Sequence, residues 1–104
     1  MSEPRMIELE VLSGPLDGCV VRLQTATEWS QAGTGSLSFP WDEELGQPQA
    51  RLAPDDKGWS LQPVKSSHGT YRVNEGERVE DVIRLNTTDI LKASTTWLLV
   101  KQIE

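Results

Sequence analysis

The sequence predicts an all-β fold, either a sandwich or a barrel, and three observations support this class. Apolar and polar residues alternate with a period of two in several short segments. Glycine, proline, asparagine and aspartate separate these segments at close spacing. No window keeps apolar residues at helical spacing over three turns. The chain has 104 residues, the common size of one domain, so we expect a single domain over 1–104 with its core at about 6–102.

The first expected element is a hairpin near the start of the chain. Apolar residues alternate with glutamates from Ile7 to Leu12, which is typical of a strand with one buried face. The segment from Gly14 to Gly18 supplies residues that fix or tolerate turn conformations. The return strand, from Cys19 to Leu23, alternates again and places Cys19 on its apolar face. We therefore expect Cys19 to be a buried structural thiol.

A second hairpin is expected between Ala50 and Leu61, with its turn at Asp55 to Gly58. The remaining β segments are shorter and are separated by polar turns. They are expected at 29–32, 37–39, 71–73, 79, 82–85, 89–92 and 96–101. The sequence has neither an internal repeat nor a low-complexity linker, which is consistent with one domain.

Four tryptophans need places in this small chain. Trp59 alternates with apolar neighbours and is expected in the core, as is Trp29. Trp41 lies in a loop, where it is either an anchor for a partner or a loop-packing residue. Trp97 and Leu98 fall on opposite faces of the last strand, so one of these two faces points to the core.

The net charge of −6 and the pI of about 4.7 argue against nucleic acid or anionic lipid as a partner. The run Asp42-Glu43-Glu44 reads as solvated surface charge that would repel a phosphate. A single cysteine cannot form an intrachain disulfide, which favours a reducing compartment. No apolar segment approaches the ~20 residues of a membrane span, so we expect a soluble, cytoplasmic protein without membrane insertion.

The sequence offers no set of residues for catalysis or metal binding. His68 is the only histidine, and a nucleophile within its reach is not indicated by the neighbouring Ser66 and Ser67. One histidine, one cysteine and scattered carboxylates give no metal-ligand spacing. We therefore expect no enzyme activity, no cofactor and no metal.

One segment and several flanking motifs resemble a known family. The segment Ser66-Ser67-His68-Gly69-Thr70-Tyr71-Arg72-Val73-Asn74 resembles the Ser-x-Asn-Gly-Thr-x-Val-Asn loop of forkhead-associated (FHA) domains. Gly14-Pro15-Leu16-Asp17-Gly18, Gly58-Trp59-Ser60-Leu61 and the stretch from Leu85 to Leu91 resemble other motifs of the family in the same order. The resemblance covers about residues 7–101. It implies an antiparallel β-sandwich of the SMAD/FHA-like type, a fold whose members bind phosphothreonine peptides.

The resemblance also implies where a partner would bind. In the family, an arginine and a serine hold the phosphate, and here their positions fall on Thr34 and Gly46. The histidine that follows the serine in the family falls on Gln49. The anion-binding residues are therefore replaced, while the loops that support them are kept. The expected contact residues are Thr34, Gln47, Gln49, Ser66, Ser67, His68, Gly69, Thr70 and Asn74.

The favoured function is a scaffold or adaptor domain that binds a protein partner, or itself, and has lost phosphothreonine binding. By analogy, related degenerate domains suggest a bacterial secretion or signalling complex as its setting. The alternative is a phosphothreonine-peptide-binding signalling domain in which Arg51 or Arg72, or else Lys65, replaces the missing cation. A third hypothesis is an enzyme subunit or small-molecule binder, which would need a deep polar pocket.

Overall fold

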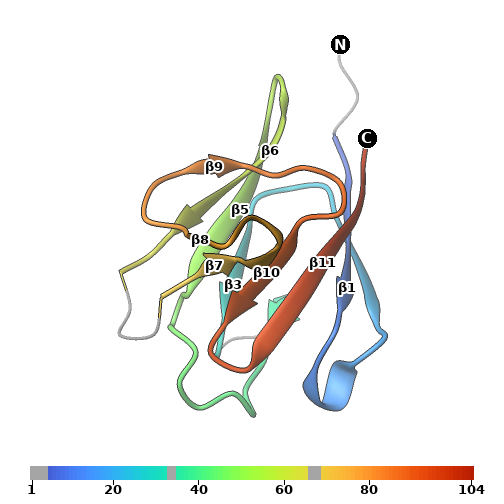
Figure 1. Cartoon of the computed structure of the whole chain (residues 1–104). Helices are drawn as coiled ribbons and strands as arrows, with labels where there is room; N and C mark the ends of the chain where they lie inside the picture. Colours follow the sequence, from blue (N-terminus) through green and yellow to red (C-terminus); the bar gives the residue numbers. More distant parts are fainter. Residues whose placement is uncertain (1–4, 33–34, 66–68) are drawn as a thin grey trace.

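The computed structural model describes residues 5–32, 35–65 and 69–104, and it is a sandwich of two β-sheets (Figure 1). The strands are β1 (Ile7–Val11), β2 (Val20–Leu23), β3 (Thr27–Ser30), β4 (Leu37–Ser38), β5 (Ala50–Asp55), β6 (Gly58–Pro63), β7 (Tyr71–Arg72), β8 (Glu77–Arg78), β9 (Ile83–Arg84), β10 (Ile90–Ala93) and β11 (Thr96–Ile103). Two short 3-10 turns, η1 (Gly14–Leu16) and η2 (Val73–Glu75), complete the elements. The six-stranded sheet has the order β2-β1-β11-β10-β7-β8, and the five-stranded sheet has the order β4-β3-β5-β6-β9.

Both predicted hairpins are confirmed. β1 pairs with β2, and β5 pairs with β6, in each case antiparallel. The long strand β11 joins the two ends of the chain, because it pairs with β1 on one side and with β10 on the other. Among the strand pairs of the described residues, β3 with β4 is the parallel one. The all-β prediction is therefore confirmed, and the architecture is the sandwich that the resemblance implied.

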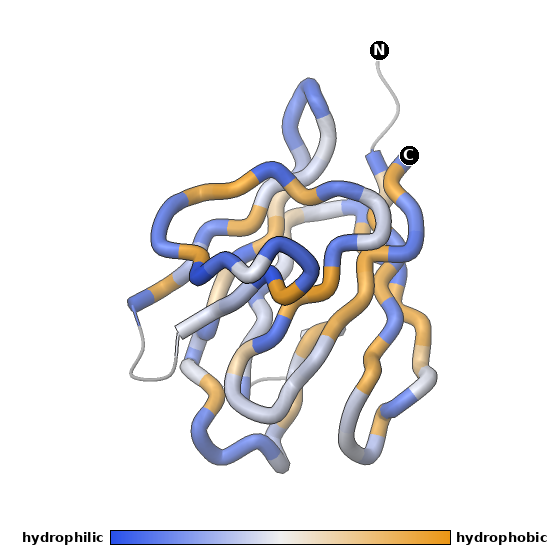
Figure 2. Tube along the Cα trace, in the orientation of Figure 1, coloured by the Kyte–Doolittle hydropathy of each residue, from blue (hydrophilic) through white to orange (hydrophobic). Residues whose placement is uncertain are grey.

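The core lies between the two sheets and is built from the inward side chains of alternating strand positions. Hydropathy alternates along β1 accordingly (Figure 2), and in β11 burial rather than hydropathy alternates from Thr96 to Val100. The buried apolar side chains are Ile7, Leu9, Val11, Leu23, Trp29, Leu37, Phe39, Leu45, Ala50, Leu52, Trp59, Leu61, Val79, Leu85, Leu91, Ala93, Leu98 and Val100. Trp29 and Trp59 are fully buried, which confirms their predicted place. In β11 the face of Leu98 points inward, and Trp97 lies on the outer face with Lys92 Nζ 5.6 Å from its ring centre.

The prediction that Cys19 is buried is wrong, because its thiol is exposed. β2 begins only at Val20 and is an edge strand, in which Val20 and Arg22 are exposed, Val21 is partly buried and Leu23 is buried. Cys19 itself closes the turn, since its amide donates to the carbonyl of Leu16 and its carbonyl accepts from the amide of Val11. The alternation of β2 is therefore real, but Cys19 precedes the strand and belongs to the turn.

The two ends of the sandwich carry different loops. The β5–β6 turn lies at one end, where Arg84 Nη1 contacts Asp55 Oδ1 at 2.6 Å (Figure 1). This hydrogen bond lowers the pKa of Asp55 to about 2. The β1–β2, β4–β5 and β10–β11 connections lie at the opposite end, which we call the loop end. Among the described residues, no helix has the length and apolar character that crossing a membrane requires.

Candidate functional site

The centre of the loop end is the side chain of Gln49, which is fully buried. Its Nε2 donates to the carbonyl oxygen of Gly69 at 3.0 Å and to Thr70 Oγ1 at 2.9 Å. Its Oε1 accepts from the amide of Gly46 at 2.7 Å. One amide group therefore ties the β4–β5 loop to the segment that follows the β6–β7 loop. Gln49 was predicted as a contact residue, and the structure places it beneath the loops as their support.

Two glycines of the loop end lie in close contact with neighbouring atoms. A Cβ on Gly46 would lie 2.9 Å from the carbonyl oxygen of Pro48 and 3.0 Å from both Cα and Oε1 of Gln49. Gly69 has a φ of +70°, and a Cβ there would lie 3.1 Å from Nε of Arg78. Gly46 therefore has no room for a side chain, and Gly69 meets two conditions that favour glycine.

Asp42 fixes the β4–β5 loop to the β10–β11 turn. Its carboxylate accepts from Ser94 Oγ at 2.6 Å, from Thr96 Oγ1 at 2.7 Å and from the amide of Thr95 at 3.1 Å. Burial raises the pKa of Asp42, but these hydrogen bonds outweigh it and hold the pKa below its ordinary value. The prediction that Asp42 belongs to a solvated acidic surface is wrong, because only 3% of the residue is exposed.

Trp41 is a loop-packing residue, one of the two roles that the sequence left open, and it is also partly exposed. Its ring packs edge-on against Phe39 with a centroid distance of 5.8 Å. A Cβ on Gly14 would lie 2.9 Å from Trp41 Nε1, so the indole also covers the β1–β2 loop. The residue is nevertheless 40% exposed. Trp41 therefore holds two loops together and presents an aromatic surface beside them.

The structure places the other predicted contact residues in different surroundings. Gln47 is exposed, and its Nε2 donates to Oε1 of Gln31 at 2.7 Å. Asn74 uses its whole amide within the fold, since it donates to Asp89 Oδ1 at 3.0 Å and accepts from the amide of Ile90 at 2.8 Å. Thr70 is buried, and its hydroxyl accepts the bond from Gln49. Thr34, Ser66, Ser67 and His68 lie outside the described residues.

The two arginines considered as replacement cations differ in availability. Arg72 contacts Glu77 at 3.0 Å and Asp89 at 3.3 Å, and its side chain is 13% exposed. Burial lowers the pKa of Arg72, but its bonds to Glu77 and Asp89 outweigh this effect and raise it. Its charge is therefore already balanced inside the fold. Arg51 lies exposed on β5, opposite Gln62 of β6.

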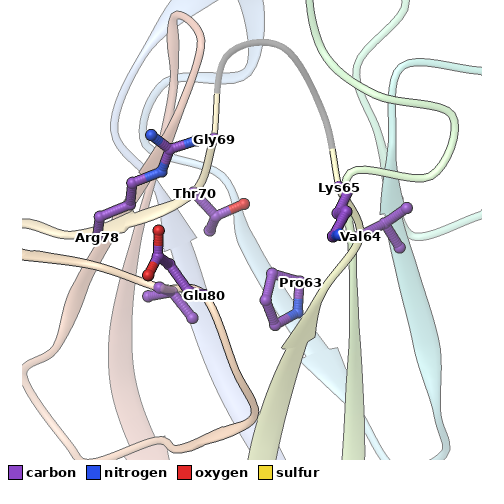
Figure 3. Close-up of a pocket in the computed structure, with 8 residues that line it drawn as sticks. Pro63, Val64, Lys65, Gly69, Thr70, Arg78 and Glu80 are labelled. Atoms are coloured by element: carbon purple, nitrogen blue, oxygen red, sulfur yellow. The ribbon is translucent and has the colours of Figure 1, made fainter.

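A pocket of about 370 Å³ lies between the end of β6 and the segment after β8 (Figure 3). It is lined by Pro63, Val64, Lys65, Gly69, Thr70, Arg78, Val79 and Glu80. The sequence reasoning missed Arg78 and Glu80 as site residues. The register of the β7–β8 pair, in which Arg78 is opposite Tyr71, brings Arg78 to Gly69, and the spacing of the sequence does not reveal this register.

Comparison with solved structures identifies the fold. A forkhead-associated domain studied for phosphothreonine-dependent interactions superposes with a TM-score of 0.78 at 15% identity, covering 93% of this chain and 96% of its own. The forkhead-associated domain of an Arabidopsis thaliana hypothetical protein gives 0.76 at 21% identity, covering 97% and 87%. That of a Chlamydia trachomatis protein gives 0.75 at 18% identity, covering 93% and 97%. The chain therefore has the forkhead-associated fold, as the sequence resemblance predicted.

No protein-family model and no curated protein matches the sequence. In the described ranges, no group of three or more histidine, cysteine, aspartate or glutamate side chains is arranged to hold a metal ion. The described site residues offer hydrogen-bonding loops, an exposed indole and a pocket with charged walls.

Proposed function

We propose that the chain is a protein–protein interaction module, a scaffold or adaptor, that binds a protein partner or a second copy of itself in the cytoplasm without requiring phosphothreonine. The loop end, with the exposed Trp41 and Gln47, is the proposed contact surface. Three features support this assignment: the forkhead-associated fold, the rigid attachment of the loops through Gln49 and Asp42, and the packing around Gly46. Loops held on a rigid scaffold are common binding surfaces.

The packing around Gly46 carries the proposal. The resemblance puts the phosphate-binding serine of the family at this position, and a serine needs a Cβ. Contacts of 2.9 and 3.0 Å to Pro48 and Gln49 leave no space for that atom. The loop is thus closed around a glycine, and the hydroxyl that would hold a phosphate has no place in it. Glu43, in the same β4–β5 loop, is exposed and adds an unfavourable charge for a phosphate.

The test compares two degenerate peptide pools that differ only in a central threonine or phosphothreonine. We expect fluorescence polarisation to give similar affinities for both pools. A phosphate held by a charge-assisted hydrogen bond would instead favour the phosphorylated pool by about tenfold to a hundredfold. Such a preference, if removed by Arg51→Met, would establish the alternative function of phosphothreonine recognition and refute our proposal.

Gly46→Ser puts back the serine that the resemblance implies, and we expect that it does not restore phosphate binding. The new side chain must displace the Pro48 carbonyl or Gln49, so the free energy of unfolding should fall by about 1–3 kcal/mol, as for other overpacked sites. Urea unfolding and the two peptide pools measure both effects. Gly35→Ser is the control, because a Cβ on Gly35 meets nothing within 4 Å. A stable Gly46→Ser variant that gains a preference for phosphothreonine would contradict the prediction.

A further inference from the structure

We propose that the pocket between β6 and β8 binds a carboxylate side chain of the partner, so that the module selects an acidic residue next to an apolar one. This inference rests on the proposed function and adds the chemistry of the partner. The pocket lies on the β6–β8 side of the Gly69–Thr70 segment, whereas Gly46 and Gln49 lie on the β4–β5 side. It is therefore distinct from Gly46, where the resemblance places the phosphate-binding serine.

Arg78 supplies the main cation. The backbone of Arg78 belongs to the β7–β8 strand pair, but its guanidinium makes no hydrogen bond or ion pair in the part of the chain that the structure describes. Its guanidinium lies against Gly69, where a Cβ would be 3.1 Å from Nε and 3.3 Å from Nη2. The missing side chain of Gly69 therefore makes room for the guanidinium at the wall of the pocket. A guanidinium fork can bind a carboxylate through two parallel hydrogen bonds.

Lys65 adds a second cation, because it lines the same pocket across from Arg78 (Figure 3). Within the described ranges Lys65 also has no carboxylate partner. Glu80 is the one acidic residue of the described lining, so the formal charge of the lining is +1. This is a local exception on a chain whose net charge is −6. Arg78 and Lys65 therefore give an anion two cationic partners inside this pocket.

The charge balance favours a carboxylate over a phosphate. A carboxylate carries one negative charge and neutralises the lining. A phosphorylated side chain carries about −1.5 to −2 and would leave negative charge beside Glu80. Both groups bind arginine, so any preference for the carboxylate must come from the net charge of the lining.

The remaining walls explain the preference for an apolar neighbour. Pro63, Val64 and Val79 form the apolar part of the lining, and Val64 is 40% exposed. The methylene groups of a glutamate can pack on such a surface while the carboxylate reaches the guanidinium. A pocket of about 370 Å³ lies within the range that accepts a small ligand, and so has room for one side chain and part of the next.

The experiment selects short random peptides displayed on phage against the whole chain and compares two variants. Arg78→Met removes the pocket cation, whereas Lys57→Met removes a charge from the exposed β5–β6 turn at the opposite end. We expect wild type and Lys57→Met to select peptides with an acidic residue beside an apolar one. Arg78→Met should lose this enrichment and bind the selected peptides about tenfold to a hundredfold more weakly. Thermal unfolding should give both variants the Tm of the wild type.

Chemical-shift mapping with a selected peptide locates the contact. We expect the amide signals of Gly69, Thr70 and Val79 to move, and Arg78→Met to abolish these shifts. Selection of peptides without acidic enrichment, or an equal loss in Lys57→Met, would overturn the inference and leave the proposed function standing. Failure to select any peptide would overturn the proposed function as well. Binding only to a phosphothreonine pool, with loss in Arg78→Met, would overturn the assignment to a carboxylate.

Discussion

Replacing Asp42 by alanine should lower the free energy of unfolding by about 3–5 kcal/mol, because it removes a buried charged acceptor from three donors. Ser94, Thr95 and Thr96 all donate to this carboxylate from the β10–β11 turn and the start of β11, which are distant in sequence. Each bond to a charged acceptor contributes about 1.5–3 kcal/mol, and the hydroxyls recover part of the loss by turning to other acceptors. Urea unfolding at neutral pH measures the change.

Asp42→Asn should be far milder, at about 1 kcal/mol. The amide oxygen can take the place of Oδ2 and still accept from Thr95 and Thr96, while the amide nitrogen donates to Ser94 Oγ. Glu43→Ala is the second control, since its exposed side chain lies next in the sequence. A loss in Asp42→Ala no larger than that in Glu43→Ala would show that the loop is not held by this carboxylate.

The charge of Asp42 also predicts a dependence on pH. Its pKa in the folded protein lies below the ordinary value of 3.8, so the unfolded chain binds the proton more tightly than the folded one. The stabilisation is therefore complete above pH 3.8 and is lost as the pH falls through this value toward the lowered pKa. We expect the difference in unfolding free energy between wild type and Asp42→Asn to stay constant at higher pH and to shrink in acid. A constant difference down to the acid range would contradict the lowered pKa.

The sequence predicted features that depend on neighbours along the chain. Strand alternation, the two hairpins and the burial of Trp29 and Trp59 follow from patterns within a few residues, and the structure confirms them. Asp42 was wrongly predicted to be solvated, because its hydrogen-bond donors lie 52 to 54 residues later in the sequence. The acidic run around Asp42 gives no sign of these donors. Arg78 was missed because its approach to Gly69 depends on strand register. The burial of a charged side chain and the approach of two loops depend on tertiary structure, so patterns of neighbouring residues do not predict them.

Gln49→Leu should lower the free energy of unfolding by about 2–4 kcal/mol, because it leaves buried polar groups without partners. Leucine has a similar volume, so the core contacts stay while the bonds to Gly46, Gly69 and Thr70 are lost. Gln49→His restores the residue type that the resemblance implies. A neutral imidazole has one donor and one acceptor, so this variant should lose about half as much or less. Urea unfolding compares the three proteins, and equal losses for leucine and histidine would refute the hydrogen-bond explanation.

Gln47→Leu tests whether a residue of the loop end contacts the partner without also stabilising the loops. Gln47 is exposed and bonded only to Gln31 among the described residues, so its replacement should change stability by about 0.5 kcal/mol or less. If the loop end binds the partner, Gln47→Leu should weaken binding of the selected peptides without loss of stability. Gln49→Leu should weaken binding and stability together, because both loops lose their common anchor. Binding that survives in Gln49→Leu but fails in Gln47→Leu would mean that the partner itself orders the loops and that Gln49 serves the fold alone.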